Sequence, residues 1–452
     1  MTTDPTQLRL PRGAHLTAAP TIGAVLLTAS GLAAQQPTMQ ELLDRIDAQD
    51  KRIAAFEQHG GNTQGAAGSD YGVDYKGGYR IFDRNGPFQL RINGRMQFRY
   101  VGFDSDSGGM TSATPNDRND FEIERGRLEF RGTFLDGDTH FYINLDADTD
   151  DNHHVIFHDF WVNHEFSEGF DLYVGKAFFP GSRDWLSGST RTHLADRSMA
   201  TTFFRPDRTL GIWAIGEPIE DVHYRVMIGN GFNTTDLESA TSSGSQIDAK
   251  FAYAGSVWWD PLATYGKGYA DLEQHEDLAV RIGATVTIAQ EQDGQLPANQ
   301  EADAIRLSDG SRLTSLMVES FDLKMGAFDA AMKYQGLSIN SEMFWRELNS
   351  VSAPSMPTVP RSFYDWGGYV DVGYMLIPHK LEAVGRFSTV QGSIRDSHEY
   401  AGGFNWYVDG THLNKLTCDA SKLDGSPTSN SGPNYRVNDD GWLFRIQWQI
   451  AF

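Results

Sequence analysis

Three arginines spaced four residues apart are the residues of this chain whose type and spacing most clearly suggest a chemistry. Arg91, Arg95 and Arg99 lie in a segment, residues 88–103, that contains no aspartate or glutamate. On a β-strand, residues four apart point to the same face and lie about 13 Å from one another. The guanidinium group stays charged and offers a planar fork of hydrogen-bond donors, which suits anions. The spacing therefore predicts a row of anion-binding groups along one strand face.

The next polar segment adds further arginines, with acids among them. Arg127 and Arg131 are predicted to share an inward face with Glu129, and Glu122 and Glu124 lie close in the sequence. Two interpretations stay open for this pair, anion binding or pairing with the acids to stabilise the wall. Anion binding is the favoured interpretation for the first three arginines, because their own segment lacks acids.

A long polar segment, residues 179–206, carries a second set of basic residues. These are Arg183, Arg191, His193, Arg197 and Arg205, against the acids Asp184 and Asp196. If the segment folds into a pore, it places net positive charge at a constriction. The alternative is an exposed surface loop.

The sequence indicates no catalytic, cofactor or metal site. Acidic and histidine residues between Asp146 and His158 could hold a divalent cation, but they lack the glycine and the distal glutamate of a calcium loop. Neither a nucleophile elbow, a phosphate-binding glycine loop nor a zinc-protease motif occurs. We therefore expect a protein that is not an enzyme and that binds neither a metal nor a cofactor.

The end of the chain shows which elements position these side chains. In residues 442–452, Trp442, Phe444, Ile446, Trp448, Ile450 and Phe452 alternate with mostly polar residues. A period of two predicts a β-strand. A final strand that ends on phenylalanine is typical of an outer-membrane barrel, where it closes the barrel and resembles the signal read by the barrel-assembly machinery. The alternative is an edge strand of a soluble sandwich.

The rest of the barrel region repeats this alternation in about sixteen segments. The predicted strands are 88–100, 120–134, 141–145, 155–166, 170–178, 207–217, 222–231, 247–260, 277–288, 318–334, 337–348, 362–376, 380–390, 397–407, 412–422 and 440–452. A change of phase near Arg125 and Gly126 predicts a bulge. Short connections alternate with long polar ones, as in outer-membrane proteins. We therefore predict an all-β, transmembrane, antiparallel β-barrel with both ends on the periplasmic side.

Composition agrees with a barrel and excludes other classes. Aromatic residues make up 12% of the 452 residues, which fits two interfacial girdles. After the first forty residues there is no apolar run long enough for a membrane-spanning helix. The net charge of −22 argues against a nucleic-acid partner, and the single Cys418 excludes an intramolecular disulfide.

The residues before the barrel show a different pattern. Residues 1–34 combine a basic head, a short apolar stretch and small residues at the end, which predicts a cleaved signal peptide. Residues 35–60 contain apolar residues at heptad spacing, which predicts a short periplasmic coiled-coil helix. A helix without a packing partner is the alternative. Residues 61–74 begin rich in glycine and predict a flexible linker to the barrel, residues 75–452.

Several segments together resemble the phosphate-selective porin O and P family. They are residues 121–132, 175–180, 196–200 followed by 204–211, 380–388 and 399–407. The resemblance runs from about residue 75 to the C-terminus. It implies a sixteen-stranded trimeric porin with a periplasmic N-terminus and an arginine ladder leading to a phosphate or pyrophosphate site.

We therefore expect an outer-membrane porin of a Gram-negative-type cell. It would pass small inorganic anions by diffusion, with phosphate or polyphosphate first among them. Its expected partners are outer-membrane lipid, two further copies in a homotrimer, and the barrel-assembly machinery through the strand ending at Phe452. The alternatives are a general or cation-tolerant porin of the same fold, and a structural barrel that tethers the envelope through its coiled coil.

Overall fold

The computed structural model describes residues 70–75, 77–106, 117–149, 155–232, 250–291, 302 and 304–452. The predicted signal peptide, the predicted coiled-coil helix and the first part of the predicted linker lie outside these residues. The last part of the predicted linker forms a strand, Tyr71–Tyr75. Across the described ranges, no helix is long and apolar enough to cross a membrane.

The described residues form eighteen strands, two short α-helices and one 3-10 turn. The strands are β1 (Tyr71–Tyr75), β2 (Tyr79–Asp83), β3 (Gln89–Ser105), β4 (Arg118–Phe134), β5 (Thr139–Asp146), β6 (Ile156–Ser167), β7 (Phe170–Phe178), β8 (Arg208–Ile219), β9 (Val222–Gly229), β10 (Ala252–Trp259), β11 (Ala279–Glu291), β12 (Ser320–Tyr334), β13 (Leu337–Ser352), β14 (Phe363–Ile377), β15 (Leu381–Gln391), β16 (Asp396–Tyr407), β17 (Asn414–Asp424) and β18 (Gly441–Ala451). The helical elements are α2 (Arg183–Leu186), α3 (Met199–Phe204) and η1 (Leu313–Leu316).

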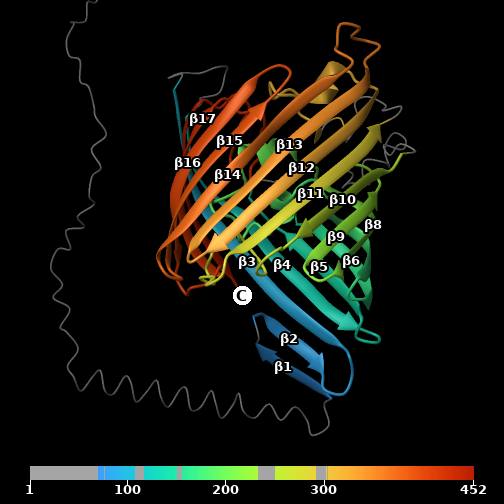
Figure 1. Cartoon of the computed structure of the whole chain (residues 1–452), viewed down its shortest axis with the longest axis vertical. Coiled ribbons are helices and arrows are strands. Elements are labelled where there is room, and N and C mark those ends of the chain that lie inside the picture. Colours follow the sequence, from blue (N-terminus) through green and yellow to red (C-terminus); the bar gives the residue numbers. More distant parts are fainter. Residues whose placement is uncertain are drawn as a thin grey trace, which may run out of the picture. The chain divides into compact units, whose positions relative to one another are not determined.

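Strands β3 to β18 close into a barrel of tilted antiparallel strands (Figure 1). Each strand pairs with the next, and β18 pairs back with β3 from Gly441 opposite Ser105 to Ala451 opposite Arg95. The predicted all-β antiparallel barrel of sixteen strands is confirmed. The hairpin of β1 and β2 lies outside this ring, and β2 pairs with the start of β3.

Alternation along β18 separates the two faces of the wall as predicted. Trp442, Phe444, Ile446 and Trp448 point outward and are 44%, 44%, 49% and 49% exposed, whereas the residues between them are buried inside the barrel. Closure satisfies the backbone of every strand without an edge. The outer surface is therefore apolar and aromatic, and polar side chains of β3 and β4 face inward.

The predicted bulge lies on β4. Between the pairs Gln97–Arg125 and Phe98–Ile123, the extra residue is Glu124. A bulge turns two successive side chains toward the same face, and Glu124 and Arg125 are both buried. Arg125 therefore joins Arg127 and Arg131 on the inner face, a position that the sequence did not predict.

Gly441 stands on the seam where β18 closes against β3. Its φ is +152°, and a Cβ added there would lie 2.2 Å from the backbone oxygen of Asp104. We expect Gly441→Ala to destabilise the folded barrel by about 2 kcal/mol, because the backbone must shift to admit the methyl group. Unfolding in urea measures this loss, with the folded fraction at each urea concentration determined from the difference in gel migration between folded and heat-unfolded barrel. Gly385→Ala is the control, since a Cβ there meets open space; equal stability of both variants would contradict the prediction.

Two segments fold into the barrel. The first, here called the inner loop (residues 179–206), carries α2 and α3, and α3 packs against β13, β14 and β15. Phe204 of α3 stacks on Phe344 of β13 with 5.3 Å between ring centroids, inside a large apolar cluster. The interior on this side is therefore packed like the core of a soluble domain.

The second segment, here called the rim segment (residues 260–278), joins β10 to β11. Other connections at the same rim are short turns, such as 168–169 and 335–336. Tyr265 and Tyr269 of the rim segment are buried, and the hydroxyl of Tyr269 donates to Oδ1 of Asp184 at 2.6 Å. Burial and the nearby Asp184 carboxylate raise the pKa of Tyr269 well above its usual value, so the hydroxyl remains a donor. The rim segment and the inner loop thus meet inside the barrel.

Candidate functional site

A cavity of about 500 Å³ lies inside the barrel along the inner faces of β3 to β8. Its lining begins near Phe452 and Gly77 at the rim of short turns, and it reaches residues 430–433 of the loop between β17 and β18. Trp185 of α2 and Phe178 of β7 line it on the side of the inner loop. The packed half of the barrel therefore leaves space next to the arginine-bearing strands.

Arginines and acidic side chains line this cavity in equal number. The arginines are Arg95, Arg125, Arg127, Arg131, Arg197, Arg205 and Arg208, and the acids are Glu124, Glu129, Asp146, Asp148, Asp159, Asp196 and Asp207. Most of these acids form an ion pair with an arginine in the same lining. The overall charge of the lining is therefore nearly balanced, and any selectivity must come from local geometry.

Two pairs of arginines face one another across β3 and β4. In the antiparallel register, Arg91 lies opposite Arg131 and Arg95 lies opposite Arg127. Glu129 lies 3.8 Å from Nε of Arg95 and 2.8 Å from Nη2 of Arg131. Like charges directly opposite one another destabilise a sheet. This part of the wall therefore has a local excess of positive charge, which a bound anion would offset.

The predicted arginines on β4 also take part in the pairing that the sequence left open. Arg127 lies 2.7 Å from Oδ2 of Asp146 and 2.8 Å from Nε2 of His158. Arg131 keeps half of its side chain exposed, at 51%. Both residues line the cavity. Arg127 and Arg131 therefore form ion pairs with acids and also line the cavity.

Arg99 takes a different position from Arg95, which is the member of the predicted β3 row that lines the cavity. The side chain of Arg99 is fully buried and lies 3.5 Å from carboxylate oxygens of Glu122, Glu124 and Asp196. Its Nε and Nη2 donate to the side-chain oxygen of Gln447 across the closing seam. Neither Arg91 nor Arg99 appears in the cavity lining, and the contacts of Arg99 correspond to the structural pairing considered as the alternative.

The predicted basic residues of the inner loop separate into two groups. Arg197 and Arg205 line the cavity, and their guanidinium carbons lie 5.1 Å and 4.2 Å from the ring centroid of Trp185. Arg183, Arg191 and His193 lie outside the lining. Arg183 stands 4.9 Å from the rings of both Tyr265 and Tyr269, and His193 is buried 3.4 Å from Glu382. Arg191 lies beside Gly268 of the rim segment.

Buried carboxylates of the barrel wall hold the start of each helix in the inner loop. Glu342 on β13 accepts from the backbone N–H of Arg183 at 2.6 Å and of Asp184 at 3.1 Å. Glu399 on β16 accepts from the backbone N–H of Met199 at 2.8 Å. The first N–H groups of a helix lack partners within the helix, so these carboxylates satisfy them and fix the loop inside the barrel.

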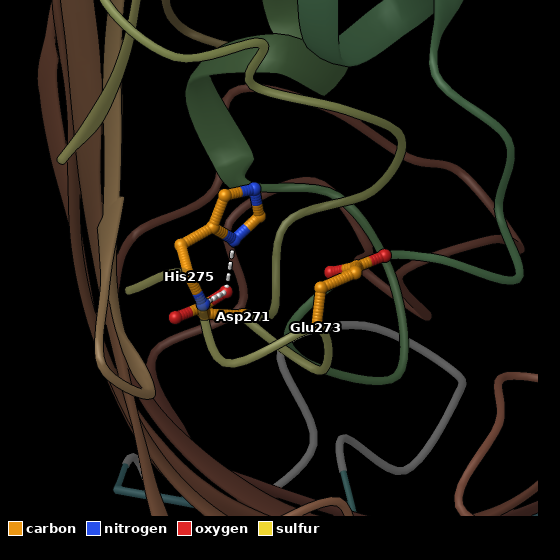
Figure 2. Close-up of side chains that lie close together, drawn as sticks. All are labelled: Asp271, Glu273 and His275. Atoms are coloured by element: carbon orange, nitrogen blue, oxygen red, sulfur yellow. Dashed lines mark hydrogen bonds and ion pairs between the residues drawn. The ribbon is translucent and has the colours of Figure 1, made fainter. Parts of the chain in front are cut away.

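A group of three possible metal ligands lies in the rim segment (Figure 2). Nδ1 of His275 and Oδ1 of Asp271 are 2.5 Å apart, and Oδ2 of Asp271 accepts from the backbone N–H of Gly336 at 2.7 Å. The ammonium group of Lys333 lies 3.8 Å from Glu273. The side chain of Asp271 therefore holds the turn between β12 and β13. The residues from Asp150 to His154, also considered for a cation, lie outside the described residues.

Sequence reasoning missed part of the cavity wall. Arg208 at the start of β8 and Trp185 in α2 line it, but neither belongs to a repeated spacing. The rim segment could have been identified from the sequence by its length, because the other connections at that rim are short turns. A polar stretch of that length on the short-turn side indicates an infolded segment.

Comparison with known proteins extends these observations. The family model described as phosphate-selective porin O and P matches residues 90–452. An anion-selective porin from Comamonas acidovorans is similar in structure, with TM-score 0.52, 11% identity, and coverage of 81% of this chain and 100% of that chain. OmpT of the Vibrio cholerae outer membrane has TM-score 0.50, 11% identity, and coverage of 81% and 99%. Curated protein sequences gave no match.

At 11% identity, the structural likeness to these two porins supports the fold alone. The family match covers nearly the whole barrel, from β3 to the C-terminus. It agrees with the closed barrel, its apolar outer face and its charged interior. The chain therefore belongs to the phosphate-selective porin O and P family and is a β-barrel channel of the outer membrane.

Proposed function

We propose that the chain allows small anions to diffuse passively through the cavity beside β3 to β8, with phosphate among them. The observation that carries this proposal is that Arg91 lies opposite Arg131 and Arg95 opposite Arg127, so that four arginines face the two acids Glu129 and Asp146. Nε of Arg91 and Nε of Arg95 are buried and lack hydrogen-bond partners within the described residues. An anion would satisfy such donors and reduce the repulsion between the guanidinium groups.

The inner loop supports the same pathway. Arg197 and Arg205 face the cavity from the side opposite the barrel wall, so an anion passing through it meets guanidinium groups on both sides. Several shallow sites, rather than one deep site, allow an ion to bind and leave. We therefore keep Arg95, Arg127, Arg131, Arg197 and Arg205 as pathway residues.

Phosphate titration of the chloride current tests this proposal. Purified protein in a planar bilayer, bathed in potassium chloride, should carry a current that falls and saturates as phosphate is added. Saturation indicates that phosphate occupies a site within the pathway. A current that does not respond to phosphate would remove phosphate from the proposal.

A weakly selective general porin is the second candidate, and one observation favours it. The cavity lining holds as many carboxylates as arginines, so the average field along it is small. In that case potassium and chloride would pass at similar rates. The equality of the two permeabilities, measured in the same bilayer, would favour this candidate.

We further infer a homotrimer with a periplasmic N-terminus. Strands β5 to β10 contain 8, 12, 9, 12, 8 and 8 residues, whereas β12, β13 and β14 contain 15, 16 and 15. A tilted strand of eight residues rises about 20 Å, less than the apolar band of about 25 Å. Neighbouring copies would cover this low wall, and lipid would cover the taller one.

We also propose that the barrel-assembly machinery recognises the aromatic C-terminal strand.

A further inference from the structure

Eight buried polar atoms without hydrogen-bond partners among the described residues lie on residues that line the same cavity, and four of them belong to one patch formed by β5, β8 and α2. Among the described residues, Nε1 of Trp185 and Nη2 of Arg208 are donors of this kind, and Oδ1 of Asn144 and Oδ1 of Asp146 are acceptors. The four residues are 5%, 5%, 1% and 3% exposed. Buried polar atoms of folded proteins are nearly always hydrogen-bonded. Unpartnered donors and acceptors around one cavity therefore indicate a ligand that both accepts and donates.

The residues that carry these atoms form one continuous patch. Nε of Arg208 donates to Asp159 at 2.8 Å, and Nδ2 of Asn144 donates to the other oxygen of Asp159 at 3.0 Å. Arg208 lies 3.7 Å from the ring centroid of Phe178, and that ring lies 4.5 Å from the ring of Trp185. Each side chain is thus held by a second contact, while one polar atom is left without a partner.

Asp146 completes the patch. Its Oδ2 accepts from Nε of Arg127 at 2.8 Å, which leaves Oδ1 without a partner. Asn144 and Asp146 lie two residues apart on β5, so their side chains point to the same inner face. The two acceptor atoms therefore lie on the same strand face, next to the guanidinium donors.

We propose that this patch is a binding site for small hydroxycarboxylates. The carboxylate would accept from Arg208 and Trp185, and the hydroxyl groups would donate to Asn144 and Asp146. Chloride only accepts hydrogen bonds and leaves both acceptors unpaired. Inorganic phosphate has no carbon skeleton to pack against Phe178. This inference rests on the proposed anion pathway and names an organic substrate class for it.

Competing carboxylates test the inference in the full-length protein. Glycerate and propionate have the same number of carbon atoms, but only glycerate carries hydroxyl groups. We expect glycerate to block the chloride current at a concentration about threefold to tenfold lower than propionate, the effect of one or two hydrogen bonds. Equal block by both acids, or phosphate displacing glycerate at equal concentration, would overturn the hydroxycarboxylate site.

A matched pair of variants locates the effect. Asn144→Ala should bring the two blocking concentrations together, because it removes a hydroxyl acceptor. Asn163→Ala is the control, since its Oδ1 is also buried and unpartnered but the residue lies outside the cavity lining. An unchanged preference for glycerate in Asn144→Ala would overturn the assignment. A wild-type channel that does not select anions would instead refute the proposed function, whatever the order of the two acids.

Discussion

Replacing Arg95 by glutamine is expected to raise the phosphate concentration that half-blocks the chloride current by about tenfold or more. Arg95 lines the cavity opposite Arg127, and its Nε has no hydrogen-bond partner within the described residues. A hydrogen bond between charged groups contributes about 1.5–3 kcal/mol. Glutamine keeps a polar side chain, shorter than that of arginine, and removes the charge. Titration of phosphate against the chloride current in a planar bilayer measures the change.

Arg361→Gln is the matched control for this experiment. Arg361 is exposed, lies in the connection between β13 and β14, and does not line the cavity. It removes the same charge from the protein without changing the pathway. Similar shifts in both variants would show that net charge, rather than the position of Arg95, determines the block.

Removal of the two carboxylates that hold the inner loop should widen the channel. In the variant Glu342→Ala with Glu399→Ala, the backbone N–H groups of Arg183, Asp184 and Met199 lose their acceptors. Each unsatisfied buried group costs about 1–3 kcal/mol. We expect the inner loop to leave its position for part of the time. Single-channel recording should show higher conductance with larger fluctuations, and the phosphate block should weaken.

Glu347→Ala serves as the control for the loop variant. Glu347 lies on the same strand as Glu342, and no side-chain hydrogen bond links it to the inner loop in the described structure. Tryptic cleavage after Arg197 offers a second measurement, since that bond becomes accessible once the loop moves. Conductance and cleavage that match the wild type in the double variant would contradict the role of the two carboxylates.

The barrel was predictable because its pattern is local. At the start of β7, the apolar residues Phe170, Leu172 and Val174 stand at every second position, and the predicted range 170–178 is the observed one. The predicted range 247–260 was too long, because β10 spans Ala252–Trp259. At strand ends, alternation alone does not show where pairing with the neighbour stops, since the outcome depends on the partner's register.

The interior was less predictable because it depends on contacts between distant residues. The spacing of Arg91, Arg95 and Arg99 placed all three on the inner face, but it did not show that Arg99 is enclosed by Gln447 and three carboxylates. Residues 179–206 are bonded inside the barrel by wall residues such as Glu342 and Glu399, which are far away in the sequence. Neither carboxylate differs in its local pattern from other inward polar residues.

The reversal potential of wild-type protein in a planar bilayer under a tenfold potassium chloride gradient tests the central claim most directly. We predict a reversal potential with the sign expected for a chloride-selective channel, because the arginines opposite one another on β3 and β4 give the pathway a local excess of positive charge. A reversal potential with the sign expected for a potassium-selective channel would contradict anion selectivity, and would show that the carboxylates of the lining determine which ions pass.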